Sequence, residues 1–407
     1  MSEERGGPLA GVRIVDLSSV VAGPYATMWL ADLGAAVIKV EPPEGDTTRQ
    51  AGAARSPDMG SVFLTLGRGK RSVRLDARTE AGRQAVLQLC RGADVFVHNM
   101  RPAAIERLGL GHDAVRAVQP DIIYAALAGF GPDGPYADRP AYDDVVQGLT
   151  GMATNLARVT GSPAYLPGVV ADKHAGLALA AAVLAALFHR ERTGQGQAVT
   201  VPLFEATAAF QLVEHLWDAT FDPPLGPPGY ARVLEPRRRP FPTADGFLCA
   251  LPYQDKHFRA LFETVDRADL AADARFGSIA NRLRNVELVQ STLAELLATR
   301  PTDEWLALFE RIGVPAVALQ TLDELLEDPH LQAVGFFEPV EHPSEGRLRL
   351  PRSPVLLSGT PVEIDPIAPR LGEHTVEALR EAGTPAALIE QVLGMAAHHD
   401  GERKDTR

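Results

Sequence analysis

The sequence predicts an α/β protein with a large Rossmann-like domain and a smaller αβ domain. Two observations support this prediction. β-rich and helix-like segments alternate over the first 200 residues, and a proline-rich stretch then separates them from a shorter αβ segment. Alternating strands and helices favour a parallel sheet with helices on its faces. Such sheets bind ligands beyond the carboxyl ends of their strands, so the residues that follow each strand are the candidate site.

The elements of the large domain follow one another along the chain. Short runs of aliphatic and β-branched residues predict strands at Val12–Leu17, Ala36–Val40, Val73–Leu75, Val95–Val97 and Ile122–Ala126. Apolar residues at helical spacing predict helices at Tyr25–Leu33, Glu80–Arg91 and Gly176–Phe188. The alternation of these two kinds of segment is the reason for expecting a parallel sheet.

The second half of the chain begins with a break. Seven prolines lie between residues 223 and 242, which excludes one continuous helix there. Helical spacing returns at Lys256–Val265, Asn285–Ala298 and Thr302–Ile312. The predicted domain order is the first part of the large domain at 1–200, a linker at 201–242, the small αβ domain at 243–325, a second linker at 326–350 and a C-terminal return to the large domain at 351–407.

The composition limits the classes of function. The chain has 407 residues and a formal net charge of −12, so it lacks the basic balance of a nucleic-acid binder. Its longest apolar segment, Gly176–Phe188, is too short to span a membrane. Two cysteines, Cys90 and Cys249, make no disulfide framework and favour a reducing compartment. We expect a cytoplasmic protein without a metal site, since His398–Asp400 lies in a polar tail.

Three segments carry candidate functional residues. Val20–Pro24 (VVAGP) lies between a predicted strand and a predicted helix, where small residues let the backbone approach a ligand. Asn99 and Met100 also lie between a strand and a helix, and Arg107 follows in that helix. Asp172 precedes a long apolar helix. From the residues alone, a tight turn, a surface arginine and an aspartate stabilised by the helix dipole remain open interpretations.

A series of segments spans nearly the whole chain in a fixed order. It opens with PLAGVRIVDLSSVVAGPYATMWLADLGAAVIKVEPPEGD and continues with GKRSVRLD, ADVFVHNMRPAAIERLGL, LAGFGPDGP, AYDDVVQGLTG, GVVADKHAG, HRERTGQGQ, EDPHLQAVGFF and LGEHT. With these segments the chain closely resembles the family III CoA-transferases of the CaiB/BaiF type. That group includes formyl-CoA transferase, the carnitine CoA-transferases and the α-methylacyl-CoA racemases. Each segment alone is weak evidence, and their common order makes the resemblance specific.

The resemblance implies a mechanism and a site. Asp172 matches the family's nucleophile, which forms a mixed anhydride with the acyl group and then an aspartyl-CoA thioester. The residues at coenzyme A positions are Val20, Ala22, Leu75, Arg78, Asn99, Met100 and Arg107. An acyl-CoA and a carboxylic acid are the implied substrates, and no permanently bound cofactor is expected. The resemblance also implies a homodimer of two interlocked rings.

Two departures from the family pattern leave alternatives open. The glycine run that covers the active site of formyl-CoA transferase is replaced by LPYQDKH at Leu251–His257. The histidine–aspartate pair of the racemases is replaced by Tyr142–Asp143. Tyrosine, with an ordinary pKa of ~10, is a poor proton shuttle near neutrality, and His174 is a weak substitute. The alternatives are an acyl-CoA racemase or epimerase acting at the α-carbon of 2-methylacyl-CoA, and a non-catalytic CoA-binding protein.

A basic run lies among the prolines of the predicted linker. We interpret Arg237–Arg239 as a solvated loop, and a contact for a ligand or a partner is the alternative.

Overall fold

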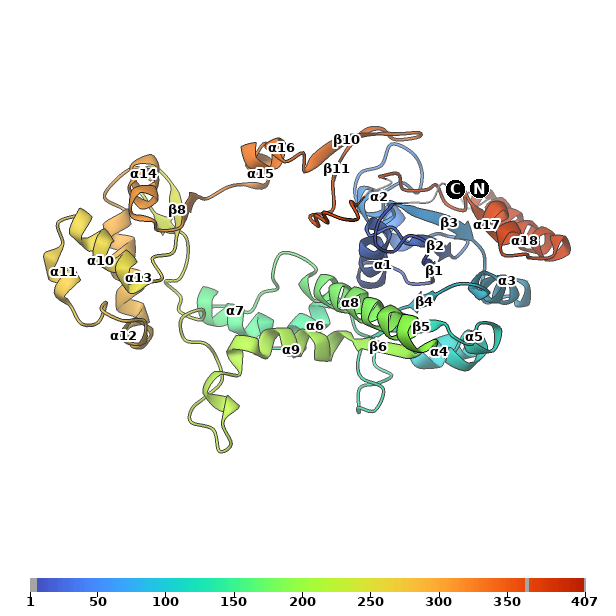
Figure 1. Ribbon diagram of the computed structural model, residues 1–407, viewed down its shortest axis with the longest axis horizontal. Coiled ribbons are helices and arrows are strands. Elements are labelled where there is room, and N and C mark those ends of the chain that lie inside the picture. The colour runs from blue at the N-terminus through green and yellow to red at the C-terminus, as the bar shows by residue number, and fades with distance from the viewer. Residues whose placement is uncertain (1–5, 363–365, 406–407) are drawn as a thin grey trace. The chain divides into compact units, whose positions relative to one another are not determined.

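The computed structural model describes residues 6–362 and 366–405 of the chain, which fold into two compact units (Figure 1). The larger unit contains the chain up to Thr150, Gly168–Ala209 and the chain from His330 onward. The smaller unit contains Gly151–Pro167 and Phe210–Pro329. Both units combine helices and strands, so the predicted α/β class is confirmed.

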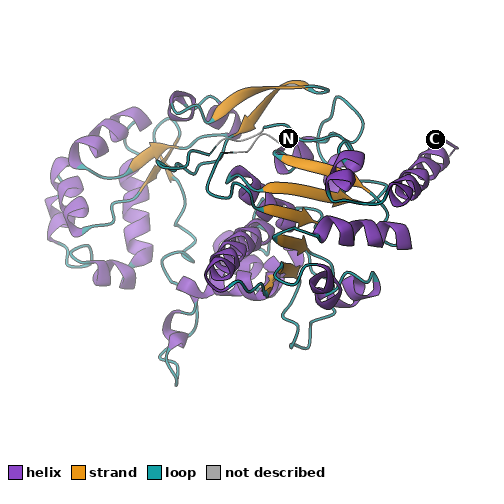
Figure 2. Cartoon of the chain, turned by 45° about the vertical axis from the view of Figure 1, so that its right-hand side comes forward, coloured by secondary structure: helices purple, strands orange, loops and turns teal. Residues whose placement is uncertain are grey.

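A six-stranded parallel sheet forms the centre of the larger unit (Figure 2). Its strands are β1 (Arg13–Asp16), β2 (Ala36–Glu41), β3 (Lys70–Arg74), β4 (Val95–His98), β5 (Ile123–Ala128) and β6 (Ala198–Pro202). Their order across the sheet is β3-β2-β1-β4-β5-β6, and every pairing is parallel. The order reverses between β1 and β4, and open parallel sheets bind ligands at such a reversal.

Helices cover both faces of this sheet (Figure 2). Successive strand residues point to opposite faces, and Ile14 and Val15 of β1 accordingly belong to two separate apolar clusters. The Ile14 cluster contains residues of α1 and α8, and the Val15 cluster contains residues of α3, α5, α17 and α18. The helices of the larger unit are α1 (Ala22–Asp32), η1 (Thr47–Gln50), α2 (Ser61–Leu66), α3 (Glu80–Cys90), α4 (Pro102–Arg107), α5 (His112–Val118), α6 (Asp143–Leu149), α8 (Val170–Thr193), α17 (Thr375–Glu381) and α18 (Ala386–Asp405).

Helix α8 is longer than the sequence predicted. It has 24 residues and ends at Gly194, whose φ of 70° is the left-handed conformation of a helix C-terminus. By length and composition it could cross a membrane, so the expectation of too short an apolar segment was wrong. Ala175, Leu179 and Val183 are nevertheless fully buried in the cluster between α8 and the sheet. These contacts make α8 a core helix of the larger unit.

The smaller unit has a core of its own. Phe262, Trp305 and Phe309 are fully buried at its centre, beside the antiparallel sheet β7-β8-β9. Its elements are α7 (Met152–Thr160), η2 (Trp217–Thr220), β7 (Phe241–Pro242), β8 (Phe247–Ala250), α10 (Asp255–Thr264), α11 (Ala268–Ala272), α12 (Ile279–Arg284), α13 (Val286–Leu297), α14 (Thr302–Ile312), β9 (Ala316–Ala318) and α15 (Leu322–Leu326). Helix α16 (Pro329–Ala333) begins at the boundary with the larger unit.

Regular secondary structure occupies parts of both segments that were predicted as linkers. The linker at 201–242 begins with α9 (Leu203–His215), a helix without proline or glycine that passes from the larger unit into the smaller one. The linker at 326–350 contains most of an antiparallel hairpin, β10 (Phe337–His342) and β11 (Gly346–Pro351). Pro339 lies within β10 and concealed this hairpin, because proline is confined to edge strands and bulges of sheets.

A network of charged residues is buried at the β1, β2 and β3 side of the sheet. Asp16, Lys39, Asp46 and Lys70 are each at most 3% exposed. Lys39 Nζ lies 2.9 Å from Asp46 Oδ2, and Lys70 Nζ lies 3.3 Å from Asp16 Oδ2. Burial lowers the pKa of Lys70 to about 8, because the charged form loses its hydration. Lys70 also explains why β3 begins before the predicted Val73: a buried lysine does not fit the apolar pattern of a strand.

A second buried ion pair extends this network. Arg49 Nε and Nη2 lie 2.6 and 2.7 Å from the two carboxylate oxygens of Glu41. The guanidinium also lies 3.6 Å from the ring centroid of Phe63. Burial opposes ionisation of Glu41, but the hydrogen bonds and charge of Arg49 outweigh it and hold the pKa of Glu41 below its ordinary value.

We predict that Arg49→Ala destabilises the larger unit by about 3–5 kcal/mol, because it leaves the Glu41 carboxylate buried without its partner. Urea unfolding followed by circular dichroism measures this loss. The matched control is Arg78→Ala, which removes an exposed pair with Asp76 and should change stability by at most about 1 kcal/mol. Equal effects of the two substitutions would contradict the role of the buried pair.

Candidate active site

The turn between β1 and α1 lies where the strand order reverses. Val20 in this turn has a φ of 68°, a left-handed conformation that β-branched residues rarely adopt. Asn99, which follows β4, accepts a hydrogen bond from Ser19 N at 3.0 Å and donates one to Ser19 O at 2.7 Å. Asp46 Oδ1 accepts a bond of 3.4 Å from Val20 N. The strained turn is therefore held by the segments that follow both neighbouring strands.

The buried charges also reach this turn from beneath. Ser18 donates hydrogen bonds to Asp16 Oδ1 from both its backbone N–H and its hydroxyl. Lys39 Nζ donates a bond of 2.9 Å to Ser18 O. The position of the turn consequently depends on the ionised network.

Two more of the predicted coenzyme residues adjoin the turn. Ala22 is the first residue of α1 and is 5% exposed. Met100 follows Asn99, donates its backbone N–H to His98 Nδ1 at 3.2 Å and packs against the core. Together with Val20 and Asn99, these residues gather where β1 and β4 end.

The remaining predicted coenzyme residues lie farther along the larger unit. Leu75 follows β3 and is 2% exposed, so its side chain is part of the core and only its backbone can meet a ligand. Arg78 is exposed and donates two hydrogen bonds to Asp76, at 2.7 and 3.0 Å. Arg107 is exposed in the last turn of α4. Within the described residues, no hydrogen bond or ion pair joins the side chains of these three residues to the β1–α1 turn.

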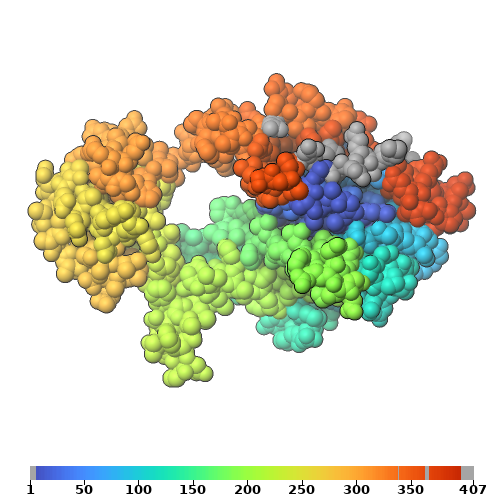
Figure 3. Space-filling view, in the orientation of Figure 1, coloured from blue at the N-terminus to red at the C-terminus, as the bar shows by residue number. Residues whose placement is uncertain are grey.

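Asp172 lies in the first turn of α8, one turn before Gly176. Helix α8 approaches α1 so closely that a Cβ on Gly176 would lie 2.6 Å from the carbonyl oxygen of Ala22. Figure 3 shows the green atoms of α8 packed against the blue N-terminal segment. Residues four apart share one face of a helix, so Asp172 is on the face of α8 that meets the start of α1. The nucleophile candidate and the predicted coenzyme turn are thereby brought together.

A second carboxylate supports Asp172. Asp143 begins α6 and is 6% exposed. Its Oδ1 accepts a hydrogen bond of 3.0 Å from the backbone N–H of Asp172, and its Oδ2 accepts one of 2.5 Å from Gln147 Nε2. Burial and the charge of Asp143 raise the pKa of Asp172 to about 6. The sequence suggested that the helix N-terminus favours the ionised form, and here desolvation and the second carboxylate outweigh that effect.

The two candidate proton shuttles are placed elsewhere. Tyr142 is 66% exposed. His174 Nε2 forms a hydrogen bond of 3.1 Å with Ala206 O in α9. Because residues two apart do not share a helix face, the ring of His174 lies on a different side of α8 from Asp172.

Several residues of the site were not recognised in the sequence. Asp143 was noted only as the partner of Tyr142, whereas it binds the backbone of Asp172. The charges within strands were a usable signal, since Asp16 ends the apolar run RIVD and Lys39 interrupts AVIKV. Gly176, at the start of an alanine-rich helix, was a weaker signal of close helix packing.

Comparison with known proteins identifies the family. The family model for CoA-transferase family III matches residues 9–375. A probable fatty acyl-CoA transferase of Mycobacterium tuberculosis is 37% identical over 335 residues, which cover 79% of this chain and 85% of that protein. A succinate–glutarate CoA-transferase of Agrobacterium fabrum is 34% identical over 391 residues, which cover 93% of this chain and 96% of that protein.

Solved structures agree with this assignment. A CaiB/BaiF family protein from Brucella suis superposes with a TM-score of 0.78 at 31% identity, covering 93% of this chain and 100% of that chain. The chain therefore belongs to CoA-transferase family III, as the resemblance of its motifs predicted.

We predict that Gly176→Ala lowers the rate of CoA transfer at least about tenfold, because misplacing catalytic groups by an ångström has costs of this size. The added methyl group would meet the Ala22 carbonyl and displace the first turns of α8. Steady-state kcat/KM measures the effect. Gly148→Ala in α6 is the matched control, since a Cβ there meets no atom within 4 Å. Loss of activity in the control alone would contradict the close-approach role of Gly176.

We predict that Asp172→Asn stabilises the protein by about 1–2 kcal/mol at pH 7. The folded pKa of Asp172, about 6, exceeds the ordinary 3.8, so the folded state binds the proton more tightly than the unfolded state. Protonated Asp172 therefore stabilises the wild type, and this contribution is complete below pH 3.8 and is lost as the pH rises through about 6. The melting temperatures of the wild type and the variant should therefore diverge as the pH rises from 3.8 to about 6. Curves that stay parallel from pH 4 to pH 7 would refute the raised pKa.

Proposed function

We propose that this protein transfers coenzyme A from an acyl-CoA thioester to a carboxylic acid, with Asp172 as the nucleophile. The observation that carries the proposal is the position of Asp172 on the α8 face that meets the start of α1. The raised pKa of Asp172, about 6, adds support. Such a carboxylate is mostly ionised at pH 7, and it is more basic than an ordinary aspartate and so a better nucleophile.

The reaction proceeds by exchange of acyl and thiol groups. An Asp172 oxygen attacks the donor carbonyl carbon, and the C–S bond breaks. The CoA thiolate departs, and a mixed anhydride between Asp172 and the donor acyl group remains. The thiolate then attacks the aspartyl carbonyl carbon and releases the donor acid, which gives an aspartyl-CoA thioester. The acceptor carboxylate attacks this thioester, and the released thiolate attacks the acceptor carbonyl of the new anhydride. The second attack forms the product thioester and regenerates Asp172.

Coenzyme A occupies the carboxyl edge of the sheet in this proposal. The coenzyme-lining residues are Val20, Ala22, Leu75, Arg78, Asn99, Met100 and Arg107. Support comes from the reversal of strand order at β1 and β4, which is also the reason to class the larger unit as Rossmann-like. Arg107 suits the 3′-phosphate of CoA, because guanidinium groups pair well with phosphate. An interlocked homodimer and a cytoplasmic location complete the proposal.

The names of relatives suggest the classes of acid. They include succinate–glutarate, succinyl-CoA:mesaconate and acetyl-CoA:oxalate CoA-transferases and a probable fatty acyl-CoA transferase. For this chain we propose an acyl-CoA donor and a carboxylic acid acceptor and leave the particular pair to a substrate panel. A racemase requires an acid and a base at the α-carbon, and the exposed Tyr142 and the α9-bound His174 count against that alternative.

We predict that hydroxylamine traps the aspartyl thioester. Incubation with an accepted acyl-CoA and hydroxylamine should convert the Asp172 carboxyl to a hydroxamate, because an activated acyl group reacts with this nucleophile and a free carboxylate does not. Mass spectrometry of the peptide containing Asp172 detects it. Asp172→Ala and Asp172→Asn should lose both the label and turnover, and Tyr142→Phe should keep both.

Racemase activity would give the opposite pattern. Solvent deuterium would enter the α-carbon of 2-methylacyl-CoA, and Asp172 would remain unlabelled. A non-catalytic CoA-binding protein would bind CoA with neither result.

We predict that kcat/KM falls about tenfold per pH unit below pH ~6, because protonated Asp172 is not a nucleophile. Asp143→Asn removes the neighbouring negative charge, so the acid limb should move to lower pH. Asp144→Asn, at the exposed neighbouring position of α6, should leave the limb unmoved. An acid limb that is identical in wild type and Asp143→Asn would contradict the electrostatic role of Asp143.

A further inference from the structure

The smaller unit contains a cavity of about 480 Å³, and all the residues that line it belong to this unit. This volume is typical of small-ligand sites, which span ~300–1,000 Å³. The wall is formed mainly by apolar side chains, which include Phe241, Leu251, Phe258, Val289 and Leu293. These residues come from β7, α10 and α13 and from the segment that directly follows β8. The cavity is therefore built on the hydrophobic core of the smaller unit.

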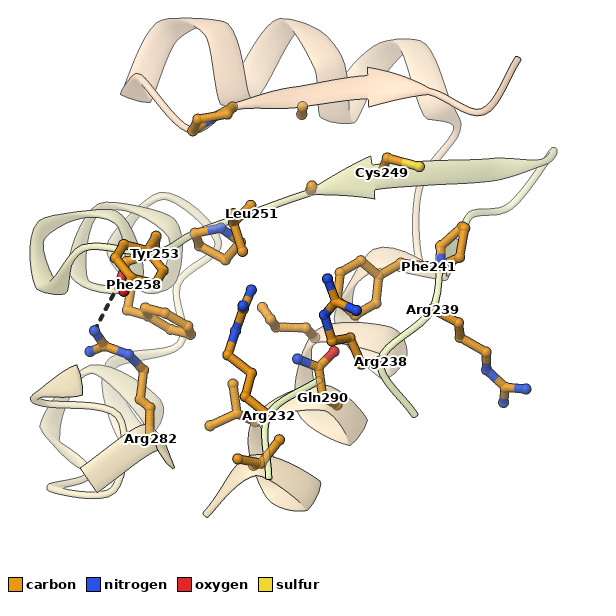
Figure 4. Close-up of a pocket in the computed structure, with 18 of the residues that line it drawn as sticks. Arg232, Arg238, Arg239, Phe241, Cys249, Leu251, Tyr253, Phe258, Arg282 and Gln290 are labelled. Atoms are coloured by element: carbon orange, nitrogen blue, oxygen red, sulfur yellow. Dashed lines mark hydrogen bonds between the residues drawn. The ribbon is translucent and has the colours of Figure 1, made fainter. Parts of the chain in front are cut away.

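Two arginines enter this apolar cavity without a carboxylate. Figure 4 shows the side chains of Arg232 and Arg238 directed into it. Neither guanidinium forms a hydrogen bond or ion pair within the part of the chain that the structure describes. No aspartate or glutamate is among the described residues that line the cavity. Partial burial and the charge of Arg232 lower the pKa of Arg238, although Arg238 as a whole is exposed, so the two guanidinium groups repel each other without an anion.

A buried amide accompanies the arginines. Gln290 lines the same cavity and is 9% exposed. Its side chain has no hydrogen-bond partner among the described residues. Its amide atoms border the open space of the cavity, so an occupant with a polar group at this side can form a hydrogen bond with them.

The other arginines of the cavity differ from this pair. Arg282 is occupied: it donates to Phe276 O at 2.7 Å and Tyr253 O at 2.9 Å and pairs with Asp255 at 2.7 Å. Arg238 and Arg239 are both exposed residues, but the side chain of Arg239 points away from the cavity whereas that of Arg238 points into it (Figure 4). The guanidinium groups that enter the cavity without an ion pair are therefore those of Arg232, which lies 5.8 Å from the ring centroid of Tyr253, and Arg238.

We propose that this cavity binds a carboxylic acid with an apolar chain. The carboxylate lies between Arg232 and Arg238 and accepts a hydrogen bond from Gln290, and the chain packs against the apolar wall. One carboxylate satisfies two guanidinium groups and an amide, and it leaves most of the wall to a hydrocarbon chain. A polyphosphate would place further charges against that wall, where burial is costly. The site concerns binding alone and is independent of Asp172.

Octanoate is a direct probe for calorimetry on the full-length chain. We expect saturable binding that weakens with added salt. The affinity should rise about two- to fourfold for each methylene group added along a series of carboxylates that starts at butanoate. Arg232→Gln and Arg238→Gln should each weaken octanoate binding at least about tenfold, the usual effect of losing a charged hydrogen bond. Octanol, which has the chain but no charge, should bind weakly and equally to all three proteins.

Two control variants separate this site from its surroundings and from the proposed transferase. Arg239→Gln should bind octanoate as wild type does, because that side chain points away from the cavity. Asp172→Asn should also bind octanoate normally, even where transfer is abolished. Octanoate binding that survives the Arg232→Gln/Arg238→Gln double substitution, or octanol binding as tight as octanoate binding, would overturn the proposal. Pyrophosphate that binds more tightly than octanoate would assign the arginines to phosphate and overturn it as well.

Discussion

Charges buried beneath the β1–α1 turn hold the geometry on which the site depends. Asp16 and Lys39 bind Ser18 from below, and Asp46 binds the backbone N–H of Val20. With this support a valine keeps a left-handed backbone conformation, which on its own would be unfavourable. Buried ion pairs contribute little net stability in general, because desolvation offsets their attraction. Here they fix the position of a backbone turn, at the edge where open parallel sheets generally bind ligands.

The position of Asp172, the proposed nucleophile, is related to that turn. Helix α1 begins directly after it, and Gly176 lets α8 approach the first carbonyl of α1. Asp172, one turn earlier on α8, is then on the helix face that meets the start of α1. Asp143 fixes the backbone of Asp172 and at the same time raises the pKa of its carboxyl. One neighbouring carboxylate thus provides both alignment and basicity, and the repulsion it introduces is a local cost in stability.

The sequence predicted the parts of this arrangement that local pattern determines. Apolar runs located all but the last strand of the parallel sheet, and ordered motifs identified the family and singled out Asp172. The apolar pattern did not reveal buried charges, because a charged residue is normally expected at the surface. Lys70 begins β3, and its ammonium group is nevertheless enclosed by Asp16 and Thr27. The Asp143–Asp172 contact joins residues that are 29 positions apart, and no local spacing reveals such a pairing. The hairpin at Phe337–Pro351 was missed because proline weakened the period-two pattern.

The most direct test of the account follows oxygen atoms through one turnover. If Asp172 forms an anhydride with each acid in turn, an acceptor acid labelled with ¹⁸O in its carboxylate must leave one labelled oxygen on Asp172. The protein is loaded with donor acyl-CoA, mixed with the labelled acid for a single turnover and digested for mass spectrometry. The account predicts that the peptide containing Asp172 becomes heavier by one ¹⁸O atom and that no other carboxylate does. Formation of the product thioester with an unlabelled Asp172 would show that the acids exchange coenzyme A without this aspartate, and it would contradict the central claim.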